Sequence, residues 1–400
     1  MEEGNVLVGG KYRLQKKVGS GSFGTVYLGN NQSTGEEVAI KVEAHTSEPQ
    51  QLLYEARILK ELQGGLGIPI LHWSGVVSHW NVLVEEMLGS TLEDLFTQTG
   101  RKFTLKTVCQ LAGQLVKRLE YIHEQSFVHR DIKPENFLVG LSKKASIVHM
   151  IDFGLSKKYR DGKTHQHIPY REGKSLTGTA RYASTNSHLG LELSRRDDME
   201  SVGYMLVYFL KGGLPWQGTR GHTKQEKYTK ILERKMAISP SVLCRGCPEV
   251  FNQYLNYCKG LRFEEKPDYT HLTNLFVELG IQQGFTFDRN FDWSEVASPV
   301  EASSRAGRSN ASSINHRHSK SREDSKNRRK SEMLSKANMK ELLRKATLSE
   351  HGSSSKSDAS SATFVNKTGG PCLNAQTRKF LNTLSPQEKT QETKGSCCLC

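Results

Sequence analysis

The sequence contains no run of about 18 apolar residues, the length that a helix needs to cross a bilayer. Residues 1–4 are acidic and lack the apolar stretch of a secretory signal. We therefore expect a cytoplasmic chain whose cysteines are reduced. Aliphatic and aromatic residues make up only 36% of the 400 residues. That fraction is low for one compact fold, so part of the chain is expected to lack a packed core.

The cysteines do not form a pattern that favours a structural zinc site. Eight are present, and Cys244 and Cys247 make a Cys-x-x-Cys pair. Tetrahedral zinc needs four ligands, and no adjacent pair of Cys or His residues supplies the other two. We therefore expect no structural metal there.

Acidic residues are outnumbered by basic ones, and the excess lies near the end of the chain. The formal net charge is +14, and residues 296–400 hold 19 Lys and Arg against 9 Asp and Glu. A basic segment suits nucleic acid, an anionic membrane surface or acidic peptides, although a solvated tail explains it equally well. Because aromatic residues do not interleave with these charges, no specific nucleic-acid binding is expected.

The hydrophobic pattern changes character along the chain. The first 90 or so residues read mostly as strands, interrupted by one amphipathic helix at 51–63. Later residues have helical spacing, with helices predicted at 107–125, 198–210 and 250–261. The pattern predicts an α+β fold in which a small β-rich lobe precedes a larger helical lobe.

One octapeptide carries most of the functional information. Residues 129–136 read His-Arg-Asp-Ile-Lys-Pro-Glu-Asn, and Asp-Phe-Gly follows at 152–154. Asp131 can accept the proton of an attacking hydroxyl, while Asn136 and Asp152 can hold Mg²⁺ against the phosphates of ATP. This order and spacing are typical of the catalytic loop and metal-binding turn of a protein kinase.

An expected ATP site precedes these motifs. Residues 19–26 fit G-x-G-x-x-G-x-V, a weak motif alone, but here it lies between two predicted strands and not at a strand-to-helix junction. Lys41 follows on the next strand and can neutralise phosphates, with Glu55 of the predicted helix as its ion-pair partner. The residues expected to bind ATP are Val18, Gly19, Ser20, Gly21, Ser22, Phe23, Gly24, Thr25, Val26, Lys41, Glu55, Glu86 and Leu88.

Further residues refine the expected chemistry. Lys133, two residues after Asp131, can contact the transferred γ-phosphoryl group as its charge develops. The Asp-Ile-Lys-Pro-Glu-Asn form resembles serine/threonine kinases. Thr179 stands where such kinases place a threonine that supports Asp131 and Lys133. Asp198 is expected to brace the backbone of the catalytic loop, which is a structural role.

The segment after the catalytic loop resembles the casein kinase 1 family. Residues 176–186 read Leu-Thr-Gly-Thr-Ala-Arg-Tyr-Ala-Ser-Thr-Asn, and residues 194–198 read Ser-Arg-Arg-Asp-Asp. Ordinary kinases carry Ala-Pro-Glu after the activation segment, whereas this family carries Ser-Ile-Asn, and here residues 184–186 are Ser-Thr-Asn. Further matches lie at 214–218, 266–269 and 291–293.

The resemblance implies a bilobal, monomeric and constitutively competent kinase domain at residues 9–294, followed by a disordered tail at 295–400. Its substrates would be acidic proteins or proteins phosphorylated three residues before the target. Lys174, Arg181 and Lys227 fall where the family gathers an anion-binding patch, and a basic triad can accept a phosphate or carboxylate. The alternative is a pseudokinase scaffold, which typically loses the equivalents of Lys41, Asp131 or Asp152.

Two positions depart from the family pattern. The residue just before the hinge, usually Met or Leu, is Glu85, and Thr185 replaces Ile. A carboxylate beside the adenine pocket either pairs with Lys41 in competition with Glu55 or points away, and we expect it to alter inhibitor binding. The sequence assigns no effect to Thr185.

The chain ends in a group of cysteines, Cys397, Cys398 and Cys400. Some members of the casein kinase 1 family end in lipidated cysteines, so S-palmitoylation and peripheral attachment to the plasma membrane or endomembranes are expected. Rab-like double prenylation and an unmodified thiol tail are the alternatives. Two or three lipids on a basic tail would anchor the chain stably. Residues 333–346 can form a short basic amphipathic helix.

Overall fold

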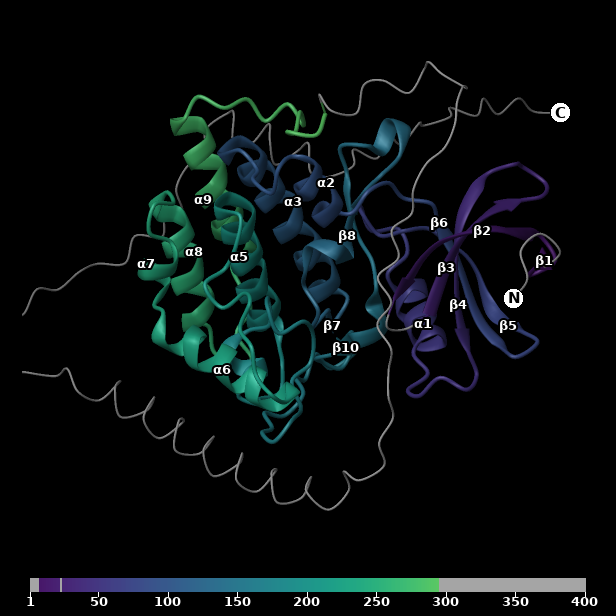
Figure 1. The fold of residues 1–400 in the computed structure, drawn as a ribbon, viewed down its shortest axis with the longest axis horizontal. Helices are drawn as coiled ribbons and strands as arrows, with labels where there is room; N and C mark the ends of the chain where they lie inside the picture. The colour runs from purple at the N-terminus through teal and green to yellow at the C-terminus, as the bar shows by residue number, and fades with distance from the viewer. Residues whose placement is uncertain (1–6, 22–23, 295–400) are drawn as a thin grey trace, which may run out of the picture. The chain divides into compact units, whose positions relative to one another are not determined.

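The N-terminal part is a six-stranded antiparallel sheet with the strand order β1-β2-β3-β4-β6-β5 (Figure 1). The computed structural model describes residues 7–21 and 24–294. The predicted tail, its helix at 333–346, its terminal cysteines and the loop residues Ser22 and Phe23 lie outside these ranges. The strands are β1 (Leu7–Val8), β2 (Tyr12–Gly21), β3 (Gly24–Asn31), β4 (Glu37–Ala44), β5 (Leu71–Val77) and β6 (Trp80–Glu86).

The two faces of this sheet differ because side chains alternate along each strand. On β4, Val38, Ile40 and Val42 are buried with Val82 and Val84 of β6, and they form a small core. The intervening residues of the same two strands point to the opposite face. That face therefore offers its side chains to the rest of the protein, and it carries the predicted phosphate-binding lysine.

The remaining described residues are mainly helical and lie beside the sheet in Figure 1. Helix α1 (Leu52–Glu61) packs on the sheet, and the larger part holds α2 (Leu92–Gln98), α3 (Leu105–Glu124), α4 (Thr185–His188), α5 (Arg195–Lys211), α6 (Lys224–Ala237), α7 (Pro240–Leu243), α8 (Glu249–Gly260) and α9 (Tyr269–Gln282). Short pairs of strands, β7 (Phe127–Val128) with β10 (Lys157–Lys158) and β8 (Phe137–Val139) with β9 (Val148–Met150), carry the functional loops. The predicted strand-rich first part and helical second part are confirmed.

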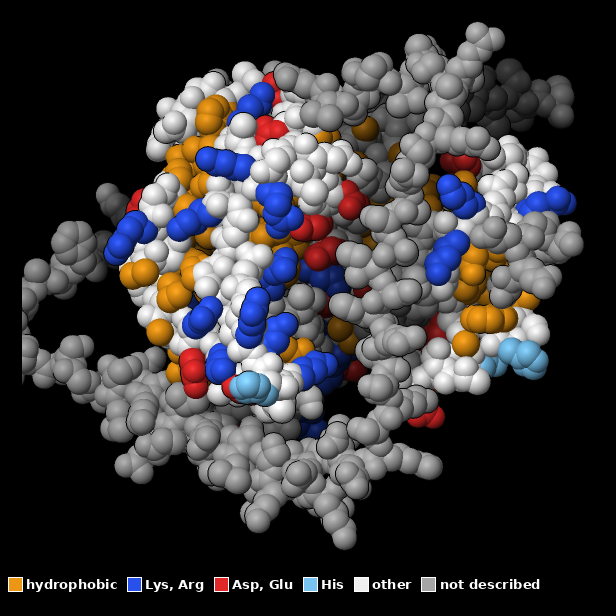
Figure 2. Space-filling view, viewed as in Figure 1, with side chains coloured by type: hydrophobic (Ala, Val, Ile, Leu, Met, Phe, Trp, Pro, Cys, Tyr) orange, Lys and Arg blue, Asp and Glu red, His pale blue; other side chains and the backbone are white. Residues whose placement is uncertain are grey.

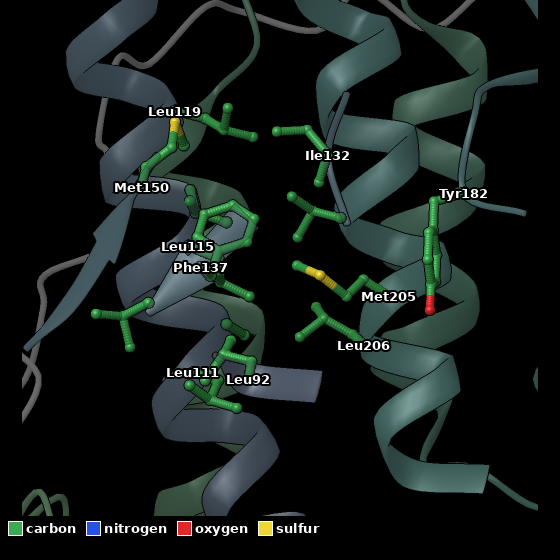
Figure 3. Packing of buried hydrophobic residues seen from close by; sticks show 14 of the residues in the cluster. Leu92, Leu111, Leu115, Leu119, Ile132, Phe137, Met150, Tyr182, Met205 and Leu206 are labelled. Atoms are coloured by element: carbon green, nitrogen blue, oxygen red, sulfur yellow. The ribbon is translucent and has the colours of Figure 1, made fainter. Parts of the chain in front are cut away.

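The core of the helical part forms between α3 and α5 (Figure 3). Leu111, Leu115 and Leu119 recur every four residues on α3, so they line one face of that helix and meet Met205 and Leu206 of α5. The loop after β7 is tied to this core by the side chain of Ile132, which is 3% exposed. The residues on either side of Ile132 are thereby held at the edge of the core.

The four helices expected from apolar spacing are all present as α1, α3, α5 and α8. Helices α6 and α9 were not predicted individually. On α6 the buried residues are only Ile231, Leu232 and Lys235, so its apolar stripe is short and one of its positions is a lysine. Within the described residues, no helix is long and apolar enough to cross a membrane.

Candidate active site

The loop between β7 and β8 is fixed from below by one buried carboxylate. Asp198, at the start of α5, accepts hydrogen bonds from the backbone amides of His129 and Arg130, both at 2.8 Å, and from the ring of His123 at 3.0 Å. Burial acts to raise the pKa of Asp198, but these hydrogen bonds outweigh it and hold the pKa below its ordinary value. The predicted bracing role of Asp198 is confirmed.

Asp131 lies on this loop with both carboxylate oxygens engaged. Its Oδ1 accepts hydrogen bonds from the backbone amide of Thr179 at 2.8 Å and from its hydroxyl at 2.9 Å. Its Oδ2 lies 2.6 Å from the Nζ of Lys133. The predicted support of Asp131 by Thr179 is confirmed, and Lys133 stands beside the carboxylate. The pair is oriented by neighbours, as a general base and its electrostatic partner need to be.

Lys41 forms the predicted ion pair with Glu55. The two side chains are 2.6 Å apart, and Asp152 approaches Lys41 to 3.7 Å. Burial acts to lower the pKa of Lys41, but the two carboxylates outweigh it and hold the pKa above its ordinary value. Lys41 is therefore a fixed positive charge between the sheet, helix α1 and the turn at Asp152.

Two residues have oxygens suited to a hard divalent cation. Asp152 has a left-handed backbone with φ of 64°, and its buried Oδ1, which lies 3.7 Å from the Nζ of Lys41, accepts no hydrogen bond from the described residues. The amide nitrogen of Asn136 donates to the carbonyl of Asp131 at 2.9 Å, so its Oδ1 is left for another partner. No three His, Cys, Asp or Glu side chains of the described chain converge on a metal site. Mg²⁺ would thus have two protein ligands here and take the others from phosphate and water, as it commonly does.

The glycine-rich segment is the hairpin that joins β2 and β3. Gly19 pairs with Val26, and Gly21 pairs with Gly24 at its tip. At Gly24 φ is +147°, and a Cβ there would lie 2.3 Å from the carbonyl oxygen of Val42. Only glycine fits that position. The same hairpin holds the other predicted ATP-binding residues that the structure describes here, which are Val18, Ser20 and Thr25.

The connection after β6 is held by side chains of both parts of the domain. Glu86 accepts a hydrogen bond from the amide of Ile70 at 3.2 Å and pairs with Lys144 at 2.5 Å. Both oxygens of the Glu86 carboxylate therefore bind protein groups, and a contact between Glu86 and a nucleotide would come from the Glu86 backbone. Leu88 is buried, and the amide of Gly89 donates to the carbonyl of Val139 at 2.8 Å.

Glu85 lies on the same face of the sheet as Lys41. In the β4–β6 ladder Ala39 faces Glu85 and Lys41 faces Leu83, so alternation puts all four on one face. The carboxylate of Glu85 makes no hydrogen bond or ion pair with the described residues, and Lys41 pairs with Glu55. Burial, followed by the charge of Glu55, raises the pKa of Glu85 to about 8. Glu85 therefore does not displace Glu55, although Lys41 is close enough to influence its charge.

The three cations of the predicted anion patch have different surroundings. Lys174 pairs at 3.3 Å with the buried Glu192, which also pairs with Lys157 at 2.8 Å. Arg181 lies over the ring of the next residue at 5.6 Å, and Lys227 is exposed on α6. No hydrogen bond or ion pair among the described residues joins these three cations to one another. Figure 2 shows Lys and Arg side chains spread over the visible face of the helical part.

The partners of Thr185 were not predicted from the sequence. Its amide and hydroxyl donate to Glu200 at 3.1 and 3.2 Å, and Lys259 lies 3.1 Å from both the hydroxyl and the carboxylate. Burial acts to raise the pKa of Glu200, but Lys259 and the hydrogen bonds hold it below its ordinary value. A threonine is accommodated there because the ion pair between the buried Glu200 and the exposed Lys259 satisfies its hydroxyl. The only sequence signal was the polar residue itself.

The fold and the site together define a class of protein, a phosphotransferase with a strand-rich part that holds Lys41 and a helical part that holds Asp131. Comparison with known families agrees with this geometry. The protein kinase domain family matches residues 12–264, which is more than half of the chain. The chain belongs to the protein kinase family, whose domains generally use ATP and Mg²⁺.

Proposed function

We propose that this protein is a serine/threonine kinase of the casein kinase 1 type, acting on acidic or phosphate-primed protein substrates. The observation that carries the proposal is the arrangement around Asp131. Thr179 holds one carboxylate oxygen at 2.8 and 2.9 Å, and Lys133 lies 2.6 Å from the other. A lysine two residues after the aspartate, supported by a threonine, is what the serine/threonine class uses.

In the proposed reaction each residue has a distinct task. Asp131 orients the substrate hydroxyl and takes its proton, while Lys133 donates to the phosphoryl group in transfer. Lys41 neutralises the α and β phosphates and is kept in place by Glu55. Asn136 and Asp152 would hold Mg²⁺, which supplies charge neutralisation at the phosphates. Catalysis then depends mainly on positioning and charge, as expected for phosphoryl transfer.

Phosphate incorporation into casein tests this function. The purified full chain should label casein on Ser and Thr and leave Tyr unlabelled when the phosphorylated residues are identified. The Asp131→Asn chain is the control for contaminating kinases. Labelling of Tyr would contradict the serine/threonine assignment. A chain that binds ATP and labels nothing would favour the pseudokinase scaffold, although Lys41, Asp131 and Asp152 are all present.

We also propose that Lys174, Arg181 and Lys227 receive the acidic or phosphorylated part of the substrate. Lys227 is the cleanest test because its side chain is exposed on α6. Replacing Lys227 by Ala should raise KM for a peptide with phosphoserine three residues before the target more than KM for the unprimed peptide. Equal changes for the two peptides would remove Lys227 from the anion site.

Attachment to membranes through Cys397, Cys398 and Cys400 remains a proposal, since these residues lie outside the described chain. The proposed location is cytoplasmic, peripheral on the plasma membrane or endomembranes, with the protein monomeric. Cell fractionation of the chain with all three cysteines changed to Ser tests the anchor. We expect the variant to leave the membrane fraction, and retention there at the level of the parent would refute lipid anchoring.

A further inference from the structure

A lysine is buried in the helical part where no part of the proposed reaction uses it. Lys235, in the last turn of α6, is 2% exposed. Burying an ammonium group costs several kcal/mol unless partners replace its water. Its position in a basic helix makes it look like a surface charge in the sequence. The burial of Lys235 therefore needs partners that replace the water around its ammonium group.

Two carbonyl oxygens and two aromatic rings lie around the Lys235 ammonium. Its Nζ donates to the carbonyl oxygens of Ala180, at 3.0 Å, and Ala183. It also lies 5.0 Å from the ring centroids of both Tyr204 and Trp216, within the range of a cation–π interaction. These two rings pack edge to face at 5.1 Å, which fixes the cage.

Lys235 does not act alone on this stretch of backbone. The ring of His188 contacts the carbonyl of Ala180 at 3.1 Å through Nε2, and the indole of Trp216 donates to the carbonyl of Arg181 at 2.7 Å. Burial, with the nearby charge of Lys235, lowers the pKa of His188 to about 3, so the imidazole is neutral and donates through Nε2. Buried side chains thus donate hydrogen bonds to the carbonyl oxygens of residues 180, 181 and 183.

The other side of the same loop is attached to the catalytic aspartate. The amides of Tyr182 and Ala183 both donate to the carbonyl of Thr179 at 2.9 Å, which closes a tight turn. Thr179 in turn donates its amide and hydroxyl to Asp131. The turn therefore lies between Asp131 on one side and the Lys235 cage on the other, and its position is set by both.

We propose that Lys235 is a positioning residue that holds the loop 178–184 against Asp131, and so sets where the protein substrate meets the catalytic aspartate. This inference rests on the proposed kinase function. It requires only that the amine donates to two carbonyls, which the charged and the neutral forms both do. Burial lowers the pKa of Lys235 to about 7, opposed by Glu200 and aided by Lys259, and neither form would release the loop.

The test uses Lys235→Met, which keeps an unbranched apolar side chain in the aromatic cage and removes the donors. Lys230→Met is the matched control, because Lys230 is an exposed lysine on the same helix whose partner is Glu226. Hydrogen–deuterium exchange of the unliganded chain reports on the loop directly. In Lys235→Met we expect the amides of 179–183 to exchange at least about tenfold faster, because the loop loses two hydrogen bonds that hold its carbonyls. Lys230→Met should match the parent.

Steady-state kinetics on a casein-type peptide provide the second measurement. KM for the peptide should rise about tenfold in Lys235→Met while KM for ATP stays within about twofold. Unchanged exchange and an unchanged peptide KM would overturn the proposal, as would equal rises in both KM values. If Lys235→Met fails to fold while Lys235→Gln folds, the glutamine variant must show the faster exchange of the amides of 179–183. Exchange at the parent rate in that variant would also overturn the proposal. Failure of both to fold would assign Lys235 to general stability instead.

The exchange experiment separates this inference from the function on which it rests. A parent chain that labels no substrate would end the proposed function, yet the loop amides of Lys235→Met would still exchange faster if Lys235 holds the loop. An active parent with a normal loop in Lys235→Met would end the inference alone.

Discussion

At the scale of single residues, the hydroxyl of Thr179 is the clearest determinant of how Asp131 is oriented. Thr179→Val keeps the shape and the backbone hydrogen bond at 2.8 Å but removes the hydroxyl bond at 2.9 Å. We expect kcat to fall about tenfold, since a hydrogen bond to a charged group is worth about 1.5–3 kcal/mol. Thr177→Val is the control, because the one hydrogen bond of the Thr177 hydroxyl within the described residues is to the carbonyl of Ser175. An equal loss in both variants would contradict the role of Thr179.

Glu85 makes the stability of the fold depend on pH. Its ordinary pKa is 4.5, and burial raises the pKa to about 8 in the folded chain. Between these values the folded chain holds a proton that the unfolded chain has lost, so Glu85 weakens the fold as pH rises from about 4.5 through about 8. In Glu85→Gln the Tm should fall less between pH 5 and pH 8.5. Melting both chains with EDTA present checks this, and parallel curves would refute it.

The same residue should affect ligands of the ATP site. Glu85 shares a sheet face with Lys41 and lacks a hydrogen bond to the described residues. A neutral, apolar residue there would remove a polar group from the wall that inhibitors contact. Glu85→Met is therefore expected to change the potency of ATP-competitive inhibitors relative to the parent chain, whereas identical potencies across a panel would show that bound inhibitors do not contact Glu85.

At the scale of elements, the β2–β3 hairpin depends on one particular glycine. A Cβ at Gly24 would lie 2.3 Å from the carbonyl oxygen of Val42, whereas a Cβ at Gly19 would meet nothing within 4 Å. Gly24→Ala should therefore lower Tm by about 5 °C, from strain and lost strand pairing, and Gly19→Ala should leave it nearly unchanged. Differential scanning calorimetry of the two variants tests this difference, and equal melting temperatures would contradict it.

Between β9 and α5, Glu192 forms ion pairs with two lysines, Lys157 and Lys174. In Glu192→Gln, Lys174 loses a competing charge and becomes available to an acidic substrate. KM for an acidic peptide should fall about threefold at low salt, and the difference should vanish at high salt because exposed charges are screened. Glu226→Gln on α6 is the control. A salt-independent change, or a higher KM, would count against competition by Glu192.

At the scale of the whole molecule, the sequence predicted what depends on local pattern and short motifs. Helices with a full apolar stripe, such as α3, were found, and so was the Lys41–Glu55 pair. Helix α6 was not predicted individually, because its buried face includes a lysine. The partners of Thr185 and Lys235 could not be foreseen, since Lys259 is 74 residues away from Thr185 and the carbonyls held by Lys235 lie 52 and 55 residues away. Such contacts exist only once the chain has folded.

The proposed function depends above all on Asp131, which would make this kinase domain an active enzyme. The most direct measurement is kcat on casein for the parent and for Asp131→Asn, with ATP affinity measured separately for both. We expect the parent to phosphorylate casein. In Asp131→Asn, kcat should fall by about 10²–10⁴ with unchanged ATP affinity, since loss of a general base typically costs that much. Equal rates for the two chains, or a parent that binds ATP without turnover, would contradict the role of Asp131 as general base.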